Sequence, residues 1–181
     1  MGRDKAFLEL GGKTLLARGL TLAASVAQQV MIVGDIRRFS AFGRVVPDVY
    51  PERGPLGGIH AALTTTTTEL NLILAVDLPF LTAEFLRYLV SQARQSQSIV
   101  TVPCSDTGFQ PLCAAYRKKF RELAEQSLLA GQNKIDSLFA KVSVRILREP
   151  ELSEQGFEPD IFRNLNTREE WENAQRLSLG T

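Results

Sequence analysis

Five places in this sequence combine a residue type and a setting that could do chemistry. Lys5 supplies a compact cation near the first residue. The other four lie directly after predicted strands: Gly34 with Asp35, Pro47 with Asp48, Asp77 and the segment 164–167. In open parallel sheets, ligands bind outside the carboxyl ends of the strands, so residues just after strands carry the most weight. A lysine and carboxylates in such places are suited to phosphate groups and a divalent metal ion.

Asp77 is the strongest candidate for a metal ligand. It follows the predicted buried strand Leu70–Val76, and a hard carboxylate oxygen at that point suits Mg²⁺. One aspartate is enough protein ligation, because phosphate oxygens and waters complete the shell of this ion. An aspartate after a strand is also an ordinary cap or turn residue, so position alone leaves both interpretations open.

Segments whose apolar residues recur with the period of a helix alternate along the chain with short apolar runs typical of buried strands. Helices are predicted over Thr14–Ala27, Gly57–Leu63, Thr82–Ser96, Lys118–Leu129, Lys134–Ala140 and from Thr167 onward. Strands are predicted over Val30–Val33, Val45–Val46, Leu70–Val76, Ser98–Pro103, Pro111–Tyr116 and Val142–Leu147. Such alternation is typical of parallel strands joined by crossover helices. We therefore predict a single α/β domain over residues 1–181, with a Rossmann-like open, mostly parallel sheet.

Charge and composition exclude several classes of partner. The 21 basic and 20 acidic residues leave a net charge of +1, which gives no field for nucleic acid or an anionic membrane. No apolar stretch approaches the ~20 residues that span a bilayer, and no signal-peptide pattern opens the sequence. Cys104 and Cys113 form neither a disulfide framework nor a zinc motif, so both are predicted to be buried small apolar residues. We expect a cytoplasmic protein that acts on small molecules.

The stretch between Asp48 and His60 is rich in glycine and proline. Gly54–Pro55 is predicted to form a tight turn, and Gly57–Gly58 would let a helix N-terminus approach a ligand closely. Glycine and proline occur in all loops, so this pattern alone also fits a plain turn and helix entry. His60, the only histidine, is interpreted as an ordinary helix residue.

Taken in order, these stretches resemble the molybdenum cofactor guanylyltransferase family, whose enzymes attach GMP from GTP to molybdopterin. The matching motifs are Gly-Arg-Asp-Lys-Ala at 2–6, Asp-x-x-Pro-x-x-Gly-Pro-Leu-Gly-Gly at 48–58, Val-Asp-Leu-Pro-Phe-Leu at 76–81, Pro-Leu at 111–112 and Asn-x-Asn-Thr-x-x-Glu at 164–170. Their order over nearly the whole chain is more specific than any single motif.

The resemblance implies a role for each matched residue on the nucleotide side. Lys5 would stabilise the phosphates, and Asp77 would hold Mg²⁺. Asp48 would help to select the base, while Gly54 and Leu56 would belong to the nucleotide site. In the implied reaction a molybdopterin phosphate oxygen attacks the α-phosphorus of GTP in line, and pyrophosphate leaves. Catalysis would then come from positioning and charge neutralisation.

On the acceptor side, the resemblance implies a place for two amides. Asn164 and Asn166 are two residues apart in an extended segment and so face the same way. They would lie near molybdopterin or the second metal-bound phosphate group. Thr167 is predicted to cap the last helix. The resemblance also implies transient contact with molybdoenzymes or with cofactor-inserting proteins.

The family pattern places a first strand and a glycine-rich loop ahead of the motif that contains Lys5. Met1 and Gly2 match the interior of that motif, so we expect an N-terminally truncated form of the domain. Such a form would lack the backbone amides that wrap the triphosphate, and it would expose a sheet edge beside Val30–Val33.

Two other functions remain open from the sequence. A related transferase could use CTP on molybdopterin or on another phosphorylated acceptor, although Gly-Pro-Leu-Gly-Gly favours GTP. A non-catalytic adaptor could bind molybdopterin or carry it to a partner enzyme. Replacing Asp77 with asparagine would abolish turnover in an enzyme and spare ligand binding in an adaptor.

Overall fold

The computed structural model describes residues 4–165 and residue 171, so Asn166, Thr167 and the predicted last helix lie outside the described residues apart from Trp171. The α-helices are α1 (Leu15–Ala24), α2 (Ile36–Phe39), α3 (Gly54–Thr65), α4 (Ala83–Ser96), α5 (Phe120–Leu129), α6 (Asp136–Phe139) and α7 (Glu149–Glu154). The 3₁₀ helices are η1 (Lys5–Phe7), η2 (Ser40–Phe42) and η3 (Pro159–Phe162). Within this part of the chain, no helix has both the length and the apolar content to cross a membrane.

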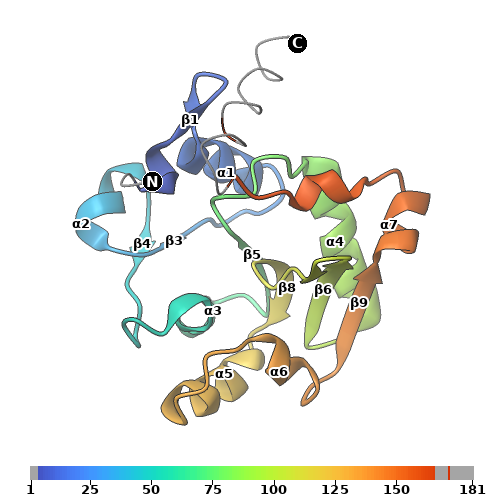
Figure 1. The fold of residues 1–181 in the computed structure, drawn as a ribbon. Helices are drawn as coiled ribbons and strands as arrows, with labels where there is room; N and C mark the ends of the chain where they lie inside the picture. The colour runs from blue at the N-terminus through green and yellow to red at the C-terminus, as the bar shows by residue number, and fades with distance from the viewer. Residues whose placement is uncertain (1–3, 166–170, 172–181) are drawn as a thin grey trace.

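The strands form one large and two small sheets. They are β1 (Glu9–Leu10), β2 (Lys13–Thr14), β3 (Ile32–Val33), β4 (Val45–Val46), β5 (Leu70–Leu74), β6 (Val100–Ser105), β7 (Gly108–Phe109), β8 (Cys113–Arg117) and β9 (Val144–Arg148). The large sheet has the order β5-β8-β6-β7, with β9 also paired to β6, while β1 pairs with β2 and β3 with β4. The predicted α/β class with an open sheet is confirmed (Figure 1).

Strand direction varies within the large sheet. β9 runs parallel to β6, and β4 runs parallel to β3, as the alternation of elements predicts. β8 runs antiparallel to both of its main neighbours, β5 and β6. Among the described residues, β5 pairs only with β8 and β3 only with β4, so each of these strands has an unpaired edge.

Helices cover both faces of the large sheet, and β8 shows how the faces divide. Ala114 and Tyr116 pack into a core formed with α3, α5 and α6. Cys113, on the opposite face, packs with α4 and α7. The alternation follows from the two-residue period of a strand. The buried Tyr116 hydroxyl donates a hydrogen bond to the Pro111 carbonyl oxygen at 2.7 Å, which satisfies its polar end.

Helix ends follow local sequence signals closely. Thr14 caps α1 by accepting from the Ala17 N–H at 3.1 Å, and Thr82 caps α4 through Phe85 at 3.2 Å. Helix α3 starts earlier than predicted: the expected tight turn at Gly54–Pro55 is wrong, because both residues lie in its first turn. Proline fits there, since its missing N–H has no partner in a first turn anyway.

Several short elements were not predicted. β1 and β2 form a hairpin through two glycines at positive φ, and α7 is a helix of 6 residues after β9. Cys113 is buried as expected, whereas Cys104 is only half-buried. Elements this short carry little periodic signal, so their formation depends on the surfaces that they cover.

Candidate functional site

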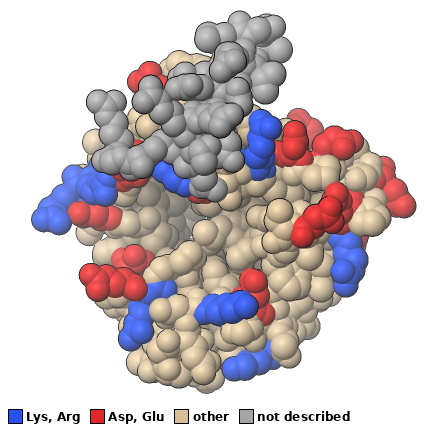
Figure 2. Space-filling model, in the orientation of Figure 1, with Lys and Arg blue, Asp and Glu red and all other residues tan. Residues whose placement is uncertain are grey.

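Three aspartates in the structure follow the ends of strands. Asp77 follows β5, Asp48 follows β4, and Asp35 follows β3 and caps α2. Figure 2 shows a hollow between the part that carries α2 and β4 and the part that carries β5 and β8, with charged side chains along its rim. This arrangement matches the rule that ligands bind beyond the carboxyl ends of the strands.

Lys5 and Asp77 are brought together across 72 residues of sequence. The Lys5 Nζ lies 3.3 Å from Asp77 Oδ2, an ion pair and hydrogen bond whose side chains are 36% and 26% exposed. The pair therefore remains accessible to a ligand. A cation and a carboxylate at this distance can together address a phosphate group and its metal ion.

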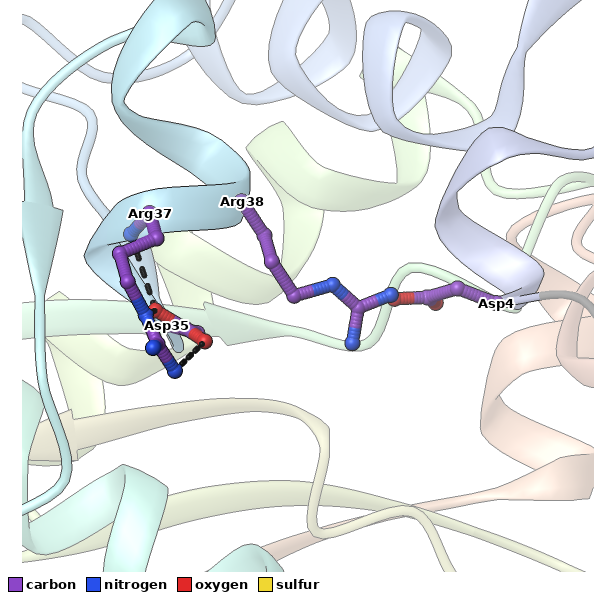
Figure 3. A network of polar contacts seen from close by, with 4 residues as sticks. All are labelled: Asp4, Asp35, Arg37 and Arg38. Atoms are coloured by element: carbon purple, nitrogen blue, oxygen red, sulfur yellow. Dashed lines mark hydrogen bonds and ion pairs between the residues drawn. The ribbon is translucent and has the colours of Figure 1, made fainter.

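An ion pair fixes the backbone that carries Lys5. Asp4 caps η1 by accepting from the Ala6 N–H at 3.0 Å, and its other carboxylate oxygen pairs with Arg38 on α2. Figure 3 shows Arg38 reaching across to Asp4, while Arg37 folds back onto Asp35. Arg38 thus ties the Lys5 segment to α2. No local sequence pattern indicates this link, because the two residues lie far apart in the sequence.

An aromatic cluster reinforces that link. Phe7, at the end of η1, stacks on Phe39 with a centroid distance of 5.8 Å and contacts Phe42 at 5.7 Å. Phe7 and Phe42 are 38% and 44% exposed, so the cluster lies at the surface. Aromatic pairs at these distances add stabilisation beyond the area that they bury. The Lys5 segment is therefore held from both sides of its short helix.

Asp48 lies against the first turns of α3. A Cβ added at Gly58 would lie 3.9 Å from Asp48 Oδ1, and one at Gly57 would lie 4.0 Å from the same atom. Although the residue as a whole is exposed, the partial burial of its carboxylate raises the pKa of Asp48. The glycines therefore let the loop that carries Asp48 approach the helix closely.

Behind that loop, three polar side chains join α3 to α5. The Tyr50 hydroxyl donates to Glu125 Oε1 at 3.3 Å, and the Tyr50 ring meets the edge of His60 at 5.1 Å. His60 is 2% exposed, and burial lowers its pKa, so the neutral imidazole is favoured. His60 is a helix residue as expected, but it also forms part of the support for the Asp48 loop.

Gly54 and Leu56, the two other residues of this motif that the resemblance assigns to the nucleotide site, lie on α3 itself. Gly54 has φ +63°, a left-handed conformation that glycine adopts without strain. Leu56 is 0% exposed and packs in the core with Ile59 and Leu63. Only the backbone of Leu56 is left to line a nucleotide site, because its side chain points away from the surface.

Asn164 lies beside the segment that follows β5. Arg163 places its guanidinium 4.6 Å from the centre of the Phe80 ring, and Leu165 packs in a cluster with Val76 and Phe80. The Oδ1 atom of Asn164 is buried and has no hydrogen-bond partner within residues 4–165 and 171. Buried acceptors are normally satisfied, so this oxygen is suited to a ligand donor or a cation. Asn166 lies outside the described residues.

The residues present fit a Mg²⁺ ion bound together with phosphate. No group of three or more His, Cys, Asp or Glu side chains in the described part of the chain could hold a metal by itself. Mg²⁺ does not need such a group, since one or two protein oxygens suffice when phosphate and water complete the octahedron. The Asp77 carboxylate and the unsatisfied Asn164 oxygen are hard donors of the required kind.

Comparison with known proteins agrees with this geometry. Residues 1–146 match the family model of the MobA-like NTP transferase domain. The molybdenum cofactor guanylyltransferase of Desulfosudis oleivorans is 33% identical over 180 residues, which cover 96% of this chain and 87% of the relative. A similar relative in Syntrophotalea carbinolica, also named molybdenum cofactor guanylyltransferase, is 28% identical over 99% of this chain and 87% of its own length.

Solved structures show the same fold. The molybdopterin-guanine dinucleotide biosynthesis protein A of Archaeoglobus fulgidus superposes with a TM-score of 0.86 at 24% identity, covering 99% of this chain and 93% of that one. The 2-C-methyl-D-erythritol 4-phosphate cytidylyltransferase of Thermus thermophilus superposes with a TM-score of 0.71 at 15% identity, over 97% and 94% of the two chains. The family inferred from the motifs is confirmed: this chain is a nucleotidyltransferase that belongs to the MobA-like NTP transferase family.

Proposed function

We propose that this chain transfers GMP from GTP to molybdopterin and releases pyrophosphate. The observation that carries the proposal is the meeting of Lys5 and Asp77 at the end of β5, in a chain 33% identical to a molybdenum cofactor guanylyltransferase. Because the reaction consumes GTP, we place it in the cytoplasm. The product would pass to molybdoenzymes or cofactor-inserting proteins through transient contact.

In this proposal each residue acts by position and charge. Asp77 would hold Mg²⁺, for which the unsatisfied Asn164 oxygen is a further candidate donor, and the bound ion would neutralise charge on the phosphates. Lys5 offers its ammonium to the phosphate oxygens, where negative charge gathers on the leaving pyrophosphate. Asp48, in the loop that lies against the first turns of α3, would help to select the guanine base. None of these roles needs a covalent intermediate, because the acceptor oxygen attacks the α-phosphorus directly.

Pyrophosphate release tests the proposal. With molybdopterin and Mg²⁺ present, we expect rapid release from GTP and at least about tenfold slower release from CTP, the preference that one or two base contacts supply. Equal rates with the two nucleotides would contradict base selection by the Asp48 loop. Tight molybdopterin binding without any pyrophosphate release would instead identify an adaptor.

Crowding at Gly57 should weaken nucleotide binding. A Cβ at this position would lie 3.1 Å from the Tyr50 carbonyl oxygen, so Gly57→Ala must push back the loop that carries Asp48. We expect KM for GTP to rise by roughly three- to tenfold with kcat little changed, as is typical when ground-state contacts are displaced.

Gly58→Ala is the matched control for that change. Its Cβ would have only ordinary contacts, 3.7 Å from Val33 and 3.9 Å from Asp48, on the same helix. Alanine in a helix is also more favourable than glycine by about 0.5–1 kcal/mol. We therefore expect Gly58→Ala to raise the unfolding temperature and leave KM unchanged. A similar KM for both variants would contradict the role given to the loop.

Arg38 should act on catalysis through Asp4, as a positioning residue. Arg38→Ala removes the ion pair that ties the Lys5 segment to α2, so the ammonium loses its fixed location. We expect kcat/KM to fall by about tenfold, an effect of misplacing a group that neutralises charge. Arg37→Ala is the control, because Arg37 pairs only with Asp35 at the surface in the described part of the chain, and we expect it to retain full activity. Equal losses in the two variants would overturn the assignment.

A further inference from the structure

The Lys5–Asp77 ion pair lies where both Mg²⁺ and a nucleotide phosphate would bind. The ammonium of Lys5 lies 3.3 Å from Asp77 Oδ2, and Asp77 is the carboxylate that the proposed function assigns to Mg²⁺. Mg²⁺ binds carboxylate oxygens at about 2.0–2.1 Å with strict octahedral geometry. An ammonium group paired with the same carboxylate repels the metal ion, and it occupies one of the two carboxylate oxygens that the ion could use.

The pair is weak enough to exchange. Both side chains are partly exposed, at 36% and 26%, and ion pairs of this kind contribute little to stability because water screens them. The backbone of Lys5 is anchored by Asp4 to Arg38, and by the Phe7 cluster. The four-carbon stem of lysine is flexible, so the ammonium can change partner while the main chain stays in place.

A nucleotide phosphate reverses the competition. Its oxygens attract the Lys5 ammonium away from Asp77, and they also supply ligands to the ion that Asp77 then holds. We propose that Lys5 competes with Mg²⁺ for Asp77 until a nucleotide phosphate takes the ammonium, so that metal and nucleotide bind cooperatively. This inference rests on the proposed function of the site. By linkage, the metal must strengthen nucleotide binding by the same factor.

Metal binding tests the inference, with Mn²⁺ as the probe and electron paramagnetic resonance of the free ion as the measurement. Lys5→Gln keeps most of the length of the side chain and removes its charge. Without nucleotide, we expect this variant to bind Mn²⁺ about five- to tenfold more tightly than the parent chain, within the usual range of coupling between sites. When a non-hydrolysable GTP analogue is present, the difference in Mn²⁺ affinity between Lys5→Gln and the parent chain should be smaller.

Two control variants distinguish competition for Asp77 from a general effect of removing positive charge. Lys5→Arg keeps the cation and should leave Mn²⁺ affinity unchanged, while Arg37→Gln removes a surface cation paired with Asp35 and should also have no effect. Unchanged or weaker Mn²⁺ binding in Lys5→Gln would overturn the inference. So would an equal gain in Arg37→Gln.

Asp77→Asn distinguishes failure of the inference from failure of the proposed function. If the site is assigned correctly, this variant loses Mn²⁺ binding without nucleotide, and in the presence of the analogue it removes no more free Mn²⁺ than the analogue does alone. Normal Mn²⁺ binding in Asp77→Asn would remove the metal role of Asp77, and the competition with it. Loss of binding in Asp77→Asn without any gain in Lys5→Gln would overturn the competition alone.

Discussion

Asp77→Asn is expected to lower kcat for pyrophosphate release from GTP by about 10³-fold, the scale of several kcal/mol of charge stabilisation by a metal ion. The amide keeps the shape of the carboxylate but removes the negative charge that Mg²⁺ requires. Single-turnover rates with molybdopterin and GTP would measure the loss. An enzyme loses turnover in this way, whereas an adaptor would keep its ligand binding.

Asp35→Asn is the control for this substitution. Asp35 also follows a strand, but it caps α2 and pairs with the exposed Arg37. Asparagine is an equally good cap, so the helix should persist. We expect the turnover of Asp35→Asn to stay close to that of the parent chain. If Asp77→Asn kept a comparable rate, the metal site would have to be elsewhere.

Phe85→Ala is expected to lower the free energy of unfolding by about 3–5 kcal/mol, the usual cost of removing a buried phenylalanine from a core. Phe85 is 0% exposed and meets Phe157 and Phe162 edge to face, each at 5.3 Å between centroids. Phe162 directly precedes the segment that carries Asn164. Urea unfolding would measure the change, and we also expect a higher KM for molybdopterin because that segment loses an anchor.

A surface leucine provides the comparison for this second prediction. Leu129, at the end of α5, is 70% exposed, so Leu129→Ala should change the unfolding free energy by no more than about 0.5 kcal/mol. Similar values for the two variants would show that the cluster around Phe85 does not hold the fold together. A large loss of stability with normal KM would show that the Asn164 segment is held by other contacts.

Much of the local structure was predictable from the sequence. The threonine caps of α1 and α4 and the apolar strand before Asp77 follow from signals within a few residues. So does the end of α3 at Thr65, inside a run of five threonines at 64–68 whose β-branched side chains disfavour a helix. Motif order also identified the family correctly. These features were accessible because capping, β-branching and burial each leave a trace in neighbouring residues.

The direction of β8 and the support of the site were not predictable in this way. A continuous apolar run such as Cys113–Tyr116 indicates that a strand is buried on both faces, but the same pattern fits a parallel or an antiparallel neighbour. Nor does any local signal show that Arg38 holds Asp4, or that Tyr50 packs against His60. Each of these contacts depends on how helices and strands from distant parts of the chain pack together.

The Lys5–Asp77 pair shows what comes from the sequence and what comes from the tertiary structure. The sequence by itself determined that Lys5 and Asp77 have the right chemistry, and that Asp77 follows a buried strand. Only the tertiary structure decided that their charged groups lie 3.3 Å apart, so that one ammonium and one carboxylate share a site. The physical reason is that residue type and periodicity record how a residue is buried, while a contact across 72 residues is set by the packing of the whole domain.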